Sequence, residues 1–298
     1  MIGAGRGAVV TPEEMREVQT SAPQSPRTVW HELVRSPTFL VGAAIVLFWI
    51  VCAIFGTTFA PHSPLAQQLL ATNAHPSGAH LFGTDQLGRD VLSRVIAGAR
   101  DILVIAAVAT LLGTVVGTAL GLVMGYFGGG VDAVVGRIVE TVLALPVIIV
   151  GVLFVRAIGP SIPTLIIVIG FVFSPLIART VRAAVLAERD LDYVAAAQLR
   201  GDKALHIMFV EILPNVLPPI LVEFTVRIGY AVFTVATLSF LGLGPPVPTP
   251  DWGADISANY TVISAGYWWE TLFPALAIAS LVIAVNLIAD GVEAVLAQ

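Results

Sequence analysis

The residues best suited to electrostatic contact with a protein partner crowd into one stretch, residues 188–203. It contains Glu188, Arg189, Asp190, Asp192, Arg200, Asp202 and Lys203, in a chain whose other long segments are mostly apolar. Between these charges lie three consecutive alanines, which favour a helix, and Gly201, which can end one. A helix this short is marginal alone in water but is stable in the groove of a partner protein. Residues 190–205 are therefore predicted to form a docking helix.

Glu223 and Arg227 form a second chemically distinctive arrangement. They are four residues apart within a long apolar segment, which places both on one face of a helix. If Pro214 marks the membrane surface, the helical rise puts them roughly 13 and 20 Å into the bilayer. Charges at that depth usually face a bundle interior or a wet cavity. Two interpretations stay open: a pair that neutralises itself, or groups that line a solute pathway and meet the charged termini of a zwitterionic solute.

Residues for catalysis or cofactor binding are not expected in this chain. The nucleotide-binding pattern Gly-x-x-x-x-Gly-Lys-Ser/Thr does not occur. The single cysteine, Cys52, excludes an internal disulfide, and the five histidines are scattered rather than spaced as metal ligands. His62, His75 and His80 share one loop and are interpreted as ordinary loop residues. We therefore expect no enzyme activity, no catalytic residue and no bound metal or cofactor. The net charge of −5, spread along the chain, indicates no nucleic-acid partner.

The elements that must position these residues are transmembrane helices. The chain is 57% hydrophobic and only 12% charged, which is about half the charged fraction of a soluble domain. Its apolar runs are continuous over about 20 residues instead of alternating, which indicates helices that cross a lipid bilayer rather than barrel strands. The predicted fold class is an all-α polytopic membrane protein with six spans, at residues 39–60, 102–127, 138–158, 162–186, 215–243 and 271–296.

The distribution of Lys and Arg predicts the orientation of these spans. With the N-terminus in the cytoplasm, the inside segments hold most of the Lys and Arg, whereas the loop 244–270 has none. Both termini and the loop 187–213 are thus expected to be cytoplasmic. The chain would then divide into four parts: a cytoplasmic tail (1–37), a first transmembrane helix (38–60), an external loop with an interfacial segment (61–101) and a five-helix core (102–298).

Small and helix-breaking residues indicate how the spans pack. Glycines recur every four residues in the second span, on one helical face where another helix can approach closely: Gly113, Gly117, Gly121 and Gly125. The approaching helix belongs either to this chain or to a partner subunit. Pro146, Pro175 and Pro274 fall inside the third, fourth and sixth spans and predict kinks there.

Several ordered motifs resemble one family of transport proteins. The set Tyr193-Val194, Ala196-Ala197, Gly201 and Ile212-Leu213-Pro214-Asn215 resembles the EAA motif of permease subunits of binding-protein-dependent ABC importers. Three further stretches resemble the C-type subunit of the dipeptide/oligopeptide/nickel branch: Phe82-Gly-Thr-Asp-Gln-Leu-Gly-Arg-Asp90, Gly125-Tyr-Phe-Gly-Gly129 and Leu238-Ser-Phe-Leu-Gly-Leu-Gly244. The resemblance covers most of the chain after the first 30 residues or so.

The resemblance implies a type I importer permease in a bacterial inner membrane, with one N-terminal span added to a five-helix core. Its partners would be a homologous second permease subunit, an extracytoplasmic solute-binding protein and two cytoplasmic ABC ATPase subunits or domains, which bind Mg-ATP. The chain would form half of the pathway for di- and oligopeptides. The resemblance further implies that the ATPase contact uses Asp192, Tyr193, Ala195, Ala196, Ala197, Leu199, Gly201, Asp202, Leu205 and Pro214.

The chain departs from the family pattern at Ala195, where the motif opens with Glu. Asp192 and Asp202 are the nearby acids able to replace its charge. Other cargoes fit the same architecture, among them nickel chelates, glutathione and other small solutes. An ion-coupled secondary transporter is an alternative of another class, but it predicts an inverted repeat, which the sequence does not show. A membrane scaffold would have no use for a docking helix beside kinked spans.

Overall fold

Long helices dominate the computed structural model, which describes residues 33–296. The expected cytoplasmic tail lies largely outside these residues. The described part contains no β-strand, only a single bridge between Thr84 and Asp90. The long helices are α3 (Pro37–Phe59), α4 (Val91–Phe127), α7 (Ile162–Glu188), α10 (Leu213–Phe240) and α12 (Trp269–Leu296). The shorter ones are η1 (Leu69–Ala71), α5 (Gly129–Leu143), α6 (Val147–Ile158), α8 (Asp192–Leu199), α9 (Ala204–His206), η2 (Ile207–Ile212), α11 (Trp252–Asn259) and η3 (Tyr260–Ala265).

Five described helices are long and apolar enough to cross a membrane, and a sixth span is formed if α5 and α6 are taken together. The sequence predicts one continuous span over 138–158, but α5 and α6 meet at an angle of 87°. Pro146 explains the break because it cannot donate the helical hydrogen bond and it disfavours a helical conformation at Leu145. It precedes the first residue of α6 and has an extended backbone. The all-α multi-span fold class is confirmed, but its third span is broken.

The helix that contains the second predicted span begins before that span. Residues 91–101, predicted to include an interfacial segment, form the first turns of α4, which is 37 residues long. Asp90 caps this helix, since its carboxylate accepts a hydrogen bond from the backbone N–H of Ser93 at 2.8 Å. The irregular part of the predicted external loop therefore ends near residue 90, and residues 91–101 are helical.

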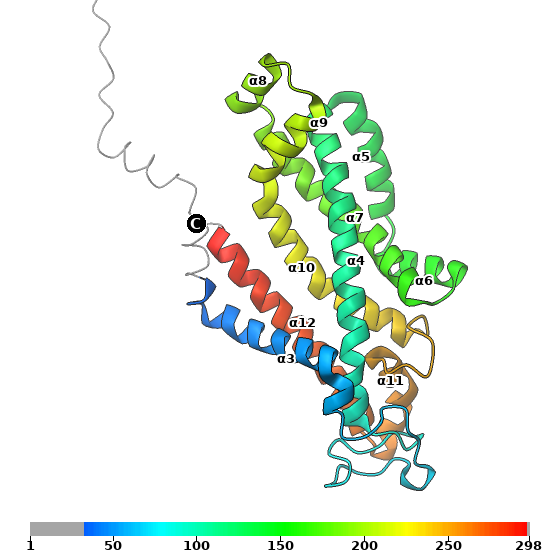
Figure 1. Ribbon diagram of the computed structural model, residues 1–298. Helices are drawn as coiled ribbons and strands as arrows, with labels where there is room; N and C mark the ends of the chain where they lie inside the picture. The colour runs from blue at the N-terminus through cyan, green and yellow to red at the C-terminus, as the bar shows by residue number, and fades with distance from the viewer. Residues whose placement is uncertain (1–32, 297–298) are drawn as a thin grey trace, which may run out of the picture.

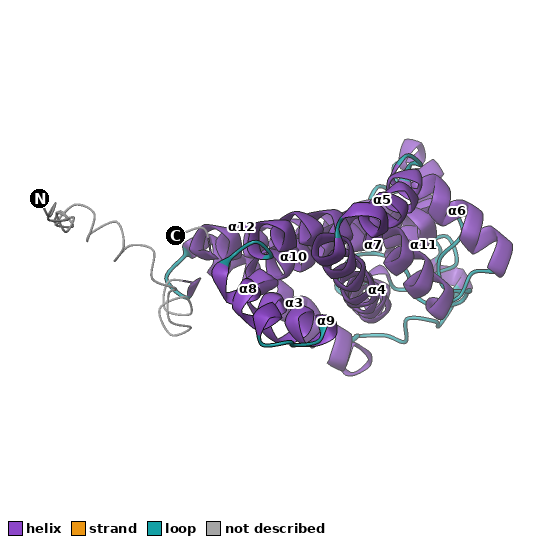
Figure 2. Ribbon diagram, turned by 90° about the horizontal axis from the view of Figure 1, so that it is seen from above, coloured by secondary structure: helices purple, strands orange, loops and turns teal. Residues whose placement is uncertain are grey.

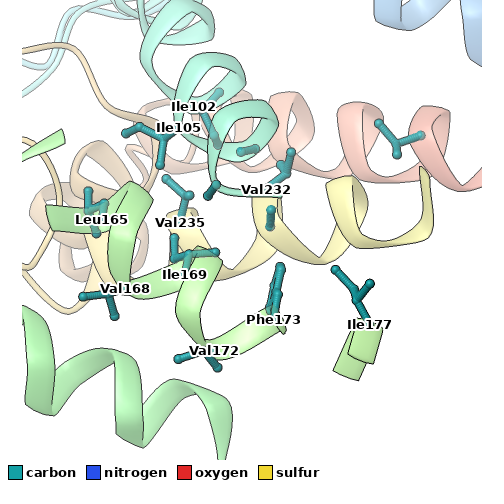
Figure 3. Packing of buried hydrophobic residues seen from close by; sticks show 14 of the residues in the cluster. Ile102, Ile105, Leu165, Val168, Ile169, Val172, Phe173, Ile177, Val232 and Val235 are labelled. Carbon is teal, nitrogen blue, oxygen red and sulfur yellow. The ribbon is translucent and has the colours of Figure 1, made fainter. Parts of the chain in front are cut away.

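Helices α4 and α7 form the spine of the molecule. The glycine stripe of α4 faces α7: a Cβ added at Gly117 would lie 2.6 Å from the carbonyl oxygen of Ser174, and one added at Gly121 would lie 2.6 Å from Cβ of Val181. The helix that approaches the stripe thus belongs to this chain. Figure 3 shows the apolar layer beside it, where α4, α7 and α10 contribute Ile102, Ile105, Leu165, Ile169, Phe173, Val232 and Val235.

The remaining elements are arranged around this spine. Helices α3 and α12 pack together on one side, while α5 and α6 lie on the other (Figure 2). Helix α8 and the irregular segment 60–90, which we call the loop cap, lie at opposite ends of the molecule (Figure 1). The loop cap is fastened to α12 by the stacked rings of Phe82 and Phe273 and by a hydrogen bond from Trp269 Nε1 to the carbonyl oxygen of Thr84.

Candidate functional site

Helix α8 presents one face outward and buries the other. Val194 and Ala197 are fully buried against the chain, whereas Ala195, Ala196 and Leu199 are exposed. Leu199 is 90% exposed, although the transfer of a large apolar side chain out of water lowers the free energy. The exposed face is therefore suited to burial against a partner protein.

Gly201 ends α8 in the manner expected from the sequence. Its φ of +80° is a left-handed conformation, which side chains other than glycine adopt only at a cost. This turn lets the N–H of Gly201 donate to Gln198 O at 3.0 Å and the N–H of Asp202 donate to Ala197 O at 3.2 Å. The last carbonyls of α8 are thereby satisfied. A Cβ at Gly201 would meet nothing within 4 Å, so backbone conformation alone requires the glycine.

Two polar contacts hold α8 on its neighbours. Arg200 binds Asp202 at 2.9 Å and Glu211 at 2.7 Å, and so ties the end of α8 to η2. Tyr193 donates a hydrogen bond from its hydroxyl to Glu188 at 2.8 Å, which ties the start of α8 to the end of α7. Burial, reinforced by this neighbouring carboxylate, raises the pKa of Tyr193 above its ordinary value. These contacts thus connect the two ends of α8 to α7 and to η2.

The α7 end of this connection is fixed to other helices by two arginines that the sequence analysis did not connect to their partners. Arg182 forms a bidentate pair with Asp132 of α5, with both N–O distances 2.5 Å. Arg189 donates to the carbonyl oxygen of Gly125, near the end of α4, at 3.1 Å. Bidentate guanidinium–carboxylate pairs are strong and geometrically specific. The signal available in the sequence was an arginine near the end of one span and an acid in the first turn of another helix.

The structure separates the predicted contact residues into an outward and an inward set. Leu199, Asp192 and Leu205, the last 67% exposed, lie at the outer surface with Ala195, Ala196, Gly201 and Pro214. Ala197 is fully buried and holds α8 against the chain, so it does not face outward. Tyr193 and Asp202 are partly buried and serve as attachments.

Of the two acids able to replace the missing motif Glu, Asp192 is the accessible one. It lies exposed in the first turn of α8. Asp202 is bound to Arg200, which also binds Glu211. A contact with a basic group on another protein is therefore open to Asp192 without breaking an ion pair of this loop.

Glu223 and Arg227 bind each other on α10. Arg227 donates from Nε to Glu223 Oε1 at 2.6 Å, and its guanidinium carbon lies 5.4 Å from the ring centroid of Tyr230. The two side chains are 18% and 14% exposed for Arg227 and Glu223, respectively. The pair is thus formed, yet it is still partly accessible on the isolated chain.

Comparisons with known proteins identify the family of this chain and a solved structure with the same fold. The family described as "Binding-protein-dependent transport system inner membrane component" matches residues 117–298, and "N-terminal TM domain of oligopeptide transport permease C" matches residues 27–76. The chain is 39% identical to a dipeptide transport system permease protein of Escherichia coli (strain K12), covering 94% of this chain and 95% of the relative. It is 35% identical to the dipeptide transport system permease protein of Bacillus subtilis (strain 168), covering 89% and 82%. A solved structure of the MetNI methionine ABC transporter in inward-facing conformations has a TM-score of 0.56 and 22% identity, covering 68% of this chain and 96% of that one, which shows a shared fold.

Proposed function

This chain belongs to the family of inner membrane components of binding-protein-dependent transport systems, and we propose that it forms half of the translocation pathway of an ATP-driven importer of di- and oligopeptides. Family membership makes the chain a multi-pass membrane protein and a permease subunit. It therefore argues against the two alternative classes, an ion-coupled transporter and a membrane scaffold. The peptide cargo is proposed from the relatives, several of which are dipeptide transport permeases. Nickel chelates, glutathione and other small solutes are the competing cargoes.

The observation that supports the coupling role is the exposed apolar side chain of Leu199 on α8, a helix that is attached to the end of α7. Leu199 protrudes into solvent, while Val194 and Ala197 on the opposite face are fully buried. Docking of an amphipathic helix into a groove buries such a side chain, which stabilises the complex by about 1.5–3 kcal/mol for one leucine. We infer that the groove belongs to a cytoplasmic ABC ATPase and that α8 is the coupling helix.

The orientation and the other partners follow from this placement. If α8 contacts the ATPase, its end of the molecule is cytoplasmic and the loop cap faces outward, where a solute-binding protein delivers cargo. Mg-ATP would bind to the ATPase partners. A homologous second permease subunit would complete the pathway. Glu223 and Arg227 are the proposed pathway groups, since their partial exposure on α10 leaves them accessible to a zwitterionic peptide.

The coupling role is tested by replacing Leu199 with Gln in the chain co-expressed with its second permease subunit and ATPases. Leu199 makes little contact within the chain, so the substitution should leave folding intact and reduce the amount of ATPase that co-purifies with the permease. The matched control is Leu70→Gln, because Leu70 is also fully exposed but lies in the loop cap. Equal ATPase recovery with Leu199→Gln and with Leu70→Gln would contradict the coupling role.

The cargo is tested separately in vesicles that contain the assembled complex and its binding protein. Dipeptides, longer peptides, nickel chelates and glutathione are compared for their ability to stimulate ATP hydrolysis. Stimulation by peptides alone supports the proposed cargo. Stimulation by nickel chelates or glutathione alone would retain the coupling role and overturn the peptide assignment.

A further inference from the structure

Two histidines that the sequence analysis treated as ordinary loop residues come together in the loop cap. His62 and His80 lie with their ring centroids 4.6 Å apart and at an interplanar angle of 35°. Both Nδ1 atoms approach one oxygen of Asp90: His80 Nδ1 is 2.8 Å and His62 Nδ1 is 3.6 Å from Asp90 Oδ1. One ligand-capable atom from each of the three residues lies within 4.8 Å of the other two. The prediction that the histidines are scattered is thus wrong for this pair.

The spacing of these atoms is close to that of a metal-ligand set. A tetrahedral Zn²⁺ site with bonds of about 2.0–2.1 Å places its ligand atoms about 3.3 Å apart. The two separations from Asp90 Oδ1, 2.8 and 3.6 Å, lie on either side of this value. Both separations from Asp90 Oδ1 are therefore close to the spacing that a shared cation requires.

The surroundings hold the three ligands in place and leave one of them without a hydrogen bond. Asp90 Oδ2 accepts hydrogen bonds from the backbone N–H and the hydroxyl of Ser93, at 2.8 and 2.6 Å. This fixes the carboxylate with its other oxygen turned to the imidazoles. The same hydroxyl accepts from the backbone N–H of His62 at 3.1 Å. His62 Nδ1 is buried and makes no hydrogen bond to the described residues, which is costly for a polar atom. A metal ion would satisfy it.

A second cluster shows by contrast why this one is suited to a metal. Asp202, His206 and Glu211 also approach one another near α9. There Arg200 already binds both carboxylates, so a cation of the protein occupies the position that a metal would take. Among the described residues, Asp90 forms ion pairs with His62 and His80 only, and neutral imidazoles are metal ligands.

We propose that His62, His80 and Asp90 form a binding site for a borderline divalent cation of the Zn²⁺ class in the loop cap. Two imidazoles and one carboxylate are a donor set that zinc accepts, and the fourth position would be taken by water. Binding replaces the proton between His80 and Asp90 and joins residues 62 and 80 to the first turn of α4. The site is remote from α8, and it does not depend on the cargo or on the coupling role.

The test uses the full chain co-purified with its partner subunits, stripped with chelator and then equilibrated with Zn²⁺ alone. Zinc per complex is measured by elemental analysis for the wild type and for His62→Ala, Asp90→Asn and His75→Ala. His62→Ala removes a ligand whose side chain is 35% exposed, so the fold should be retained. Asp90→Asn keeps an oxygen that can cap α4 but removes the charge. His75→Ala is the matched control, because His75 lies in the same segment and packs on Trp269 instead.

The expected result is one zinc more per complex in the wild type and in His75→Ala than in His62→Ala, and a loss of zinc in Asp90→Asn as well. Zinc should also raise the thermal unfolding temperature of the wild type and of His75→Ala but not of His62→Ala. Equal zinc content in the wild type and in His62→Ala would overturn the site, whether the shared value is zero or reflects zinc bound elsewhere in the complex. Loss of zinc in His75→Ala equal to that in His62→Ala would overturn it as well.

Discussion

Substituting Gly201 should weaken coupling through the backbone alone. Its φ is +80° and a Cβ there would meet no atom within 4 Å, so a new side chain has room but an unfavourable conformation. A non-glycine residue in the left-handed region costs about 1–2 kcal/mol, whereas Asn is tolerated better. Gly201→Ala should thus lower the population of the left-handed turn that ends α8, relative to other conformations, by a factor of about 5–30. The decrease should be smaller for Gly201→Asn.

The assay is the stimulation of ATP hydrolysis by cargo-loaded binding protein in vesicles. The expected order of stimulation is wild type, then Gly201→Asn, then Gly201→Ala, with the amount of assembled complex unchanged. Gly130→Ala is the matched control, since a Cβ at Gly130 also meets nothing within 4 Å but the position has no positive φ. Alanine at position 130, which lies in α5, should leave the stability of that helix unchanged or raise it.

Two outcomes would refute this reasoning. If Gly201→Ala couples as well as the wild type, the left-handed turn is not required to hold α8 for docking. If Gly130→Ala loses as much stimulation as Gly201→Ala, the loss follows from replacing a glycine at either position rather than from the left-handed conformation at Gly201.

Three further predictions concern the packing and charge of the helices. Gly117→Ala should lower the thermal unfolding temperature, because overpacking costs about 1–3 kcal/mol, whereas Gly136→Ala, whose nearest atom would be 4.0 Å away, should not lower it. Arg227→Gln should destabilise the chain more than the double variant Glu223→Gln/Arg227→Gln, since the single change leaves a partly buried charge unpaired; normal peptide transport by the double variant would exclude the pair from the pathway. Burial raises the pKa of Asp251, so the folded protein keeps a proton that the unfolded chain has released, and stability should fall as the pH rises above about 4. Asp251→Asn, which can still cap α11, should flatten this dependence; an unchanged slope of unfolding temperature against pH would refute it.

The fold class and the family were accessible from the sequence because both depend on local patterns. Lipid requires about 20 consecutive apolar residues for each crossing helix, and this signal is read without knowing which helices touch. The alanine-rich segment before Gly201 likewise predicted a helix, observed as Asp192–Leu199. The prediction of a continuous third span was wrong, although the sequence shows Pro146 within it. A proline predicts a weakened helix, but whether the chain kinks or breaks depends on what packs against it.

Contacts between distant residues were not accessible in this way. Nothing in the spacing of Asp132 and Arg182, fifty positions apart, selects that pair among the acids and arginines near the ends of the spans. Ala197 illustrates the same limit within a single helix. Its type suits a docking face as well as a buried one, and only the neighbours of α8 turn it inward.

The sequence by itself determined that this protein crosses a membrane, where most of its apolar helices fall and where a short helix ends at Gly201, because hydropathy, helix propensity and glycine conformation act over a few residues. Only the tertiary structure decided that the glycine stripe faces α7, that Glu223 and Arg227 bind each other and that His62 and His80 meet at Asp90. These outcomes depend on the close packing of helices and on the path of the loop cap, which bring together residues that no local pattern relates.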